Sequence, residues 1–112
     1  MDNVKDNIYY AKKIVVDMQF LIANTKGQTI EQISKNEILL DSIMFRLIQI
    51  SENTTKLSEN FKRSNNEIPW SAIKGLRNRI VHDYGNVDYG IIYETVIDEI
   101  PYCLEMILKI IG

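Results

Sequence analysis

Apolar side chains recur at alternating steps of four and three along much of this chain. The pattern is clearest near the N-terminus, where it runs through Val4, Ile8, Ala11, Val15, Met18 and Ile22. Such spacing places the apolar side chains on one face of an α-helix, and that face has to be buried against other helices. No segment shows the strict alternation of apolar and polar residues that is typical of a strand. The sequence therefore predicts an all-α protein.

The same spacing predicts four main helices with short connections, as in an up-and-down bundle. They cover about residues 4–23, 29–57, 70–82 and 88–110, and the second begins either at Thr29 or again at Ser34, each of which has a capping-box partner three positions on. The polar connection 58–69 contains Phe61, which is expected to fold a short extra turn onto the bundle. Pro101 lies inside the last helix and removes one backbone hydrogen bond, so a kink is expected there. The length predicts a single domain over residues 1–112.

Composition narrows the class of protein. With 46% apolar and 25% charged residues, the chain is an ordinary globular protein rather than a disordered one. It has no apolar run of about twenty residues and no signal-peptide pattern, so no membrane span and a cytoplasmic location are expected. Cys103 is the only cysteine and lies in an apolar helical run, which predicts a buried, inert thiol. With one cysteine and one histidine, neither a metal nor a resident cofactor is expected.

Charge is distributed unevenly, although the net value is only −2. Residues 56–82 carry six basic and two acidic side chains, whereas residues 83–112 carry one basic and six acidic side chains. A basic region of this kind would attract a phosphate backbone. Alternatively, the two oppositely charged regions pair with each other inside the bundle. The sequence leaves both interpretations open.

The basic residues gather around segment 70–84, which also contains the only histidine, His82. On a helical wheel, Arg77 falls in the middle of the apolar face formed by Trp70, Ile73, Ile80 and Val81, and it is therefore predicted to face inward. A buried guanidinium has to be paired because the loss of its hydration is costly. Four explanations remain open for Arg77. A carboxylate such as Glu52 pairs with it, or its side chain extends to solvent at the rim of the bundle. Otherwise the helix ends before Arg77, so that the wheel does not apply, or Arg77 belongs to a functional site.

The order of residues 77–84, R-N-x-x-x-H-x-Y, resembles the signature of the HEPN superfamily in its HepT-like toxin branch. The resemblance extends over about residues 46–101 and has further matching segments. They are RLIQISE (46–52), with Ser51 in place of the usual glycine, IPW (68–70), GLRN (75–78), NVDY (86–89) and IP (100–101).

This resemblance implies a toxin with endoribonuclease activity that needs no metal ion and acts as a homodimer with a composite site. The implied catalytic residues are Arg77, Asn78 and His82, with Arg46, Glu52 and Arg79 as supporting candidates. The resemblance also implies a nucleotidyltransferase antitoxin as partner. That enzyme would use ATP to add AMP to Tyr84 and so keep RNA out of the site.

The residue types by themselves suit cleavage of RNA. An imidazole can transfer a proton near neutral pH, and a guanidinium can hold a phosphate with two hydrogen bonds. Arg77 and His82 are five positions apart, about 140° on a regular helix, so one helix does not point both at one phosphate. A second copy related by a two-fold axis would bring the two groups together.

The sequence also allows two other interpretations of what the chain does. In one, the chain is a non-catalytic helical module that binds nucleotide or the transferase, and Arg77 and His82 serve only as phosphate ligands. In the other, it is a structural bundle, His82 is a polar residue at a helix end, and Tyr84 is hydrogen-bonded at the edge of the core.

Overall fold

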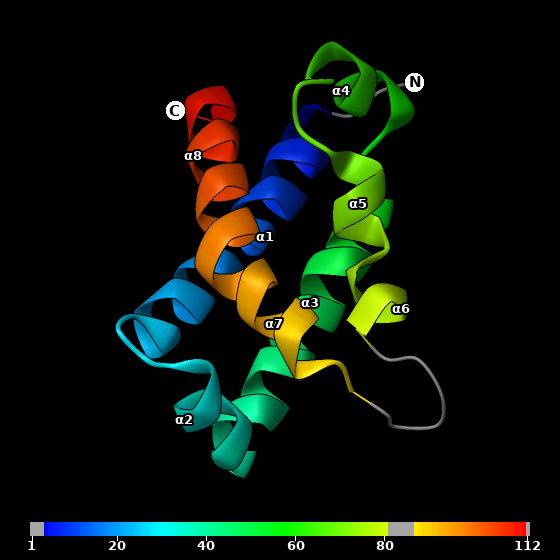
Figure 1. Ribbon diagram of the computed structural model, residues 1–112. Helices are drawn as coiled ribbons and strands as arrows, with labels where there is room; N and C mark the ends of the chain where they lie inside the picture. The colour runs from blue at the N-terminus through cyan, green and yellow to red at the C-terminus, as the bar shows by residue number, and fades with distance from the viewer. Residues whose placement is uncertain (1–3, 81–86, 112) are drawn as a thin grey trace.

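The computed structural model describes residues 4–80 and 87–111, and every regular element in these ranges is helical (Figure 1). The long helices are α1 (Val4–Thr25), α3 (Glu37–Thr55) and α8 (Ile100–Ile111). The short elements are α2 (Ile30–Lys35), α4 (Glu59–Ser64), α5 (Trp70–Lys74), α6 (Leu76–Ile80), α7 (Tyr89–Glu94) and a π-helical turn, η1 (Thr95–Glu99). None of these helices is long and apolar enough to cross a membrane. The prediction of an all-α fold is confirmed.

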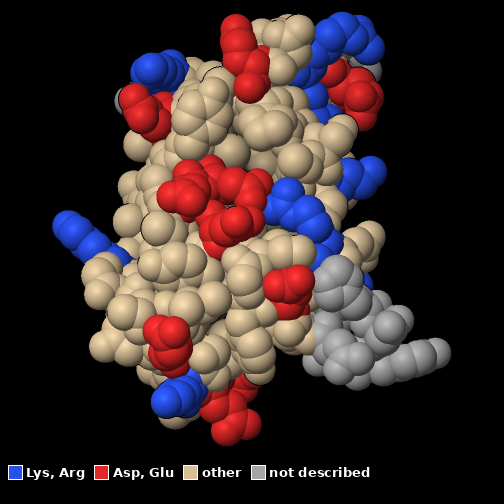
Figure 2. All heavy atoms as spheres, viewed as in Figure 1, with Lys and Arg blue, Asp and Glu red and all other residues tan. Residues whose placement is uncertain are grey.

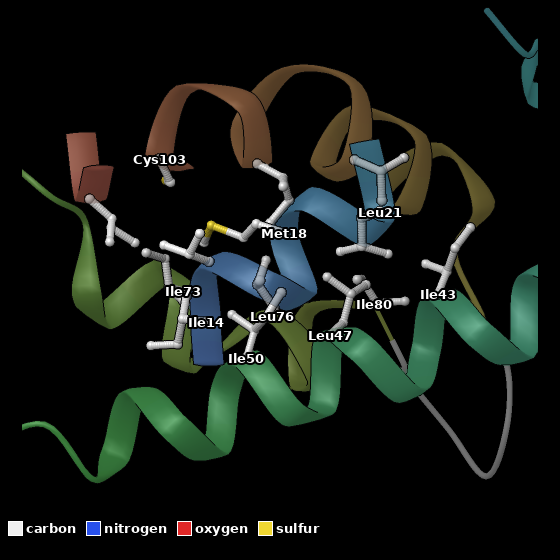
Figure 3. Packing of buried hydrophobic residues seen from close by; sticks show 14 of the residues in the cluster. Ile14, Met18, Leu21, Ile43, Leu47, Ile50, Ile73, Leu76, Ile80 and Cys103 are labelled. Atoms are coloured by element: carbon white, nitrogen blue, oxygen red, sulfur yellow. The ribbon is translucent and has the colours of Figure 1, made fainter. Parts of the chain in front are cut away.

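Helix α1 packs against both α3 and α8, and it supplies the centre of the core. Its side chains Ile14 and Met18 are completely buried, in the same core cluster as Leu47 and Ile50 of α3 (Figure 3). The buried apolar residues of the helices form one cluster. The apolar spacing of residues 4–23 therefore did identify the side of α1 that is buried.

The predicted second helix is split into α2 and α3. The capping box predicted at Thr29 is present: the Thr29 N–H donates to Gln32 Oε1 at 2.8 Å, and the Gln32 N–H donates to Thr29 Oγ1 at 3.1 Å. The alternative start at Ser34 is wrong, because Ser34 lies within α2. Asn36 caps α3 instead, since its Oδ1 accepts a hydrogen bond from the Leu39 N–H at 3.0 Å.

The polar connection contains α4, which confirms the short extra turn around Phe61. Its N-cap is Ser58, whose Oγ accepts a hydrogen bond from the Phe61 N–H at 3.1 Å. Asn7 of α1 fixes this cap, because its Oδ1 accepts a hydrogen bond from the Ser58 N–H at 2.9 Å. The start of α4 is thus tied to the N-terminal part of α1.

The last helical column consists of α7, η1 and α8 in succession. Asp88 caps it as the sequence predicts, accepting a hydrogen bond from the Ile91 N–H at 3.0 Å. A kink was expected at Pro101, and the structure has a π-helical turn on the N-terminal side of this residue, where the Ile100 N–H donates to the carbonyl of Thr95. Proline has no N–H and crowds the carbonyl four residues earlier, so the helix widens just before it.

Cys103 lies on the buried side of α8, as predicted. Burial, with a smaller contribution from the charge of Glu99, raises the pKa of its thiol to about 11. Because the thiolate is the reactive form, little of Cys103 is reactive at neutral pH.

Candidate functional site

The predicted helix over residues 70–82 is broken at Gly75. This glycine has φ −87° and ψ 4°, which departs from helical geometry, and its N–H donates to the carbonyl of Ser71 at 3.0 Å. After the break, Leu76 and Ile80 are buried while Arg77 is exposed. The prediction that Arg77 faces inward is therefore wrong. The helical wheel assumed regular steps of about 100° through Gly75, and the change of ψ at this residue rotates everything that follows.

Arg77 lines an open cleft of about 400 Å³ between α3 and the α5–α6 pair. Lys74, Arg77 and Asn78 line it from α5 and α6, and Ile48, Ser51, Glu52 and Thr55 line it from α3. The two sides are held together by a buried hydrogen bond, in which Ser51 Oγ donates to the carbonyl of Ile73 at 3.1 Å. This bond fixes α5 on α3 and so determines the position of the cleft wall that carries Lys74.

The cleft is basic on its α5–α6 side. Neither Lys74 nor Arg77 has a carboxylate within ion-pair distance among residues 4–80 and 87–111. Glu52 lines the same cleft but is itself exposed. The interpretation in which Glu52 neutralises a buried Arg77 is therefore wrong. In the same part of the chain, no three His, Cys, Asp or Glu side chains lie close enough together to hold a metal ion.

Arg79 points away from this cleft and pairs with the last helical column. Its Nη2 lies 2.9 and 3.0 Å from the two carboxylate oxygens of Glu99, and 3.3 Å from Thr95 Oγ1. Pairing between the basic and acidic regions of the sequence therefore accounts for Arg79. It does not account for Lys74 or Arg77, which leaves their charges available to a ligand.

These contacts also position the chain on both sides of residues 81–86. Besides the pairing of Arg79 with η1, the Asp88 N–H donates to the carbonyl of Ile80 at 3.0 Å, so the end of α6 and the cap of α7 lie together. His82 and Tyr84 themselves lie outside the described residues, and their predicted roles stay predictions.

Arg46 does not belong to the cleft. Its Nη1 lies 2.8 Å from Asp17 Oδ1, and its guanidinium covers the ring of Phe20 at 4.0 Å from the ring centre. It thus connects α3 to α1. Of the residues singled out by the sequence, the structure brings Arg77, Asn78 and Glu52 together and leaves Arg46 and Arg79 outside.

Lys74 was missed as a site residue by sequence reasoning, although a signal was present. It lies three positions before Arg77, a spacing that puts two side chains on neighbouring parts of a helix surface. The signal was overlooked because Arg77 was assigned to the buried face.

Comparison with known proteins identifies the family of this chain. A family model described as "Ribonuclease HepT-like" matches residues 10–110. A protein of Caldanaerobacter subterraneus named "Putative RNase TTE0752" is 31% identical over 102 residues, which are 91% of each chain.

Two archaeal proteins are also similar. "Gamma-glutamylcyclotransferase and putative RNase MJ0434" of Methanocaldococcus jannaschii is 30% identical over 95% of this chain and 48% of its own length. "Probable ribonuclease HepT" of Thermococcus cleftensis is 35% identical over 46% of this chain and 47% of its own. No solved structure gives a significant match. The extent of the family match shows that this chain belongs to the HepT-like ribonuclease family of the HEPN superfamily.

Proposed function

We propose that this chain is a metal-independent endoribonuclease whose scissile phosphate binds in the cleft beside Arg77. The observation that carries the proposal is the state of Arg77: it is exposed, has no carboxylate partner in the described parts of the chain, and shares a cleft with Lys74 and Asn78. A guanidinium in this state can bind a phosphate with two hydrogen bonds. Membership of a ribonuclease family points to RNA as the source of that phosphate.

The reaction requires one nucleophile, one proton acceptor and a stabilised phosphoryl group. The ribose 2′-oxygen attacks the adjacent phosphorus, the bond from phosphorus to the 5′-oxygen breaks, and the products are a 2′,3′-cyclic phosphate and a 5′-hydroxyl. His82 would take the proton of the 2′-hydroxyl or return one to the 5′-oxygen, a contribution of about 10²–10⁴ in rate. Arg77 would stabilise the charge that builds on the phosphoryl oxygens, and Asn78 would orient the phosphate or His82.

A homodimer is part of the proposal. It follows from the sequence spacing: if a regular helix continued from Arg77 to His82, the two side chains would be about 140° apart, and a single helix would not aim both at one phosphate. Two copies related by a two-fold axis would combine the Arg77 of one with the His82 of the other.

The first test is cleavage of RNA by the purified chain with a metal chelator present. We expect cleavage to continue, and mass spectrometry to find 2′,3′-cyclic phosphate ends, because neither Arg77 nor His82 needs a metal ion. The matched control is the same oligonucleotide made of DNA, which lacks the nucleophile and should stay intact. RNA that is bound but not cut would instead favour a non-catalytic binding module, and cleavage that depends on a divalent cation would contradict the mechanism.

We further propose that the chain is a toxin and that a nucleotidyltransferase antitoxin inactivates it by adding AMP to Tyr84. The transferase would supply the AMP from ATP, so this chain would hold no cofactor of its own. A bulky anionic group two positions after His82 would compete with RNA for the basic cleft.

Incubation with the cognate transferase and ATP is therefore expected to add the mass of AMP to the wild-type chain and to stop RNA cleavage. Tyr84→Phe is the matched control, since it lacks only the acceptor hydroxyl and should show no gain in mass. A wild-type chain that gains no mass, or that gains it at another residue, would contradict this part of the proposal.

A further inference from the structure

A second cleft adjoins the candidate site along α4 and α5. It has a volume of about 700 Å³, and its polar lining comes from Glu59, Lys62, Arg63, Asn66, Ser71 and Lys74. Lys74 also lines the cleft that contains Arg77 and Asn78, so the two hollows meet at this side chain. Cavities of this size each have room for a group as large as a nucleotide. Lys74 is therefore a wall common to the two clefts, and we call the two clefts together the depression.

The charge along this depression is positive and largely uncompensated. Lys62 is paired with Glu59 at 3.3 Å, but Arg63 bonds only to the neutral amide of Asn60, and neither Arg63 nor Lys74 has a carboxylate partner in the described part of the chain. Both side chains are exposed. In Figure 2, basic side chains lie along the edge formed by α4 and α5, with some acidic ones beside them at the α4 end, whereas acidic side chains gather over η1 and α8. A polyanion would be drawn to the first of these surfaces and repelled by the second.

The wall between Arg63 and Lys74 suits a sugar-phosphate backbone better than stacked bases. The indole of Trp70 is nearly fully buried, its N–H donates to the carbonyl of Asn65 at 3.0 Å, and its ring lies 6.1 Å from that of Phe61. Trp70 thus stiffens the wall but offers no open ring face. Asn66 and Ser71 add neutral polar groups to the same lining. Contacts of this kind hold a phosphate backbone in place without reading its bases.

We propose that single-stranded RNA beside the scissile phosphate follows this depression, from Arg77 past Lys74 to Arg63. We call the surface formed by Arg63, Lys74 and Arg77 the basic track. The inference rests on the proposed function, because the position of the scissile phosphate at Arg77 sets where the track begins. It adds the direction in which the bound RNA strand extends from the site, and it adds a binding role for Arg63.

The test compares the binding of a long and a short RNA. Both are made with 2′-O-methyl riboses, which remove the nucleophile, so that affinity is measured without cleavage. The short one is a dinucleotide, which fills the Arg77 cleft but does not reach Arg63, and fluorescence anisotropy gives the long-to-short ratio of affinities. Any general effect of a substitution on folding or on the cleft cancels in this ratio.

Three variants give a distinctive pattern. Arg63→Ala is expected to lower the ratio several-fold and to reduce the slope of log affinity against log salt for the long RNA by about 0.7, the value for one phosphate contact on a single strand. Lys74→Ala is expected to weaken both RNAs, because Lys74 lines both clefts. The matched control is Lys12→Ala, which removes one exposed positive charge from the groove between α1 and α3 and should keep the wild-type ratio.

A wild-type ratio in Arg63→Ala would overturn the track, and so would an equal loss in Lys12→Ala. In either case the basic surface would be left for another ligand, such as an acidic partner protein. Failure of the track and failure of the ribonuclease proposal can be told apart. If the wild-type chain cuts no RNA but Arg63→Ala still lowers the ratio, the track stands and the catalytic proposal fails. If the wild-type chain cuts RNA and the ratio does not change, only the track fails.

Discussion

Replacing Arg77 by alanine is expected to lower the rate of RNA cleavage about 10²–10³-fold while leaving the fold intact. The loss follows from the role proposed for its guanidinium, since a preorganised donor that stabilises developing charge contributes about this much. The fold should be kept because Arg77 is exposed and has no ion-pair partner within the described residues. The measurement is the single-turnover rate on a defined RNA, together with circular dichroism and a melting curve for the same sample.

Two further substitutions sharpen this result. Arg77→Lys keeps the charge but loses the planar pair of donors, so it should recover only part of the activity. Lys35→Ala is the charge-matched control, because it removes an exposed cation at the end of α2, outside the residues that line the cleft. Wild-type rates in Arg77→Ala would remove the mechanism, and an equal loss in Lys35→Ala would show that only overall charge matters.

Truncation of Ile50 to alanine is expected to destabilise the protein by about 2–5 kcal/mol. Ile50 is 0% exposed and lies where α3 faces α1 in the core, so the shorter side chain leaves a cavity that its neighbours fill only in part. For a domain of this size, the melting temperature should fall by roughly 10 °C or more. Chemical denaturation followed by circular dichroism gives the free energy of unfolding directly.

The same helix provides a matched control for this substitution. Ile38 is 82% exposed, so Ile38→Ala removes the same atoms without opening a cavity and should change stability by no more than about 0.5 kcal/mol. Similar losses in the two variants would contradict the burial of Ile50 in the core and the exposure of Ile38. Ile50→Ala is also expected to disturb the cleft, since the next residue, Ser51, donates the hydrogen bond that fixes α5 on α3.

The backbone of the site is held by contacts with other helices, whereas its basic side chains have no carboxylate partner among the described residues. Ser51 binds the backbone of α5, and Arg79 binds η1, so both ends of the segment that carries Lys74 and Arg77 are anchored to other helices. Lys74 and Arg77 take no part in this anchoring. A basic group can therefore be replaced in the cleft with little cost in stability, which makes the catalytic predictions separable from folding defects.

The sequence by itself determined the class of the fold and the family. Apolar spacing is a local property of the chain, and it correctly marked the buried sides of α1 and α8, the capping box at Thr29 and the cap at Asp88. The ordered match from the segment around Arg46 to Pro101 pointed to the HepT-like family, which the family comparison confirms. Neither conclusion required knowledge of which residues meet in space.

The orientation of the site residues was decided by the tertiary structure. A helical wheel adds the same angle for every residue. The backbone angles of Gly75 depart from helical values, and this single departure is enough to bury Leu76 and expose Arg77. The pairing of Arg79 with Glu99 and the meeting of two clefts at Lys74 depend on how distant helices pack, and no local pattern encodes that packing. The sequence thus supplied the chemical groups, and the packing of α5 and α6 on α3 determined which of their charges remain available to a ligand.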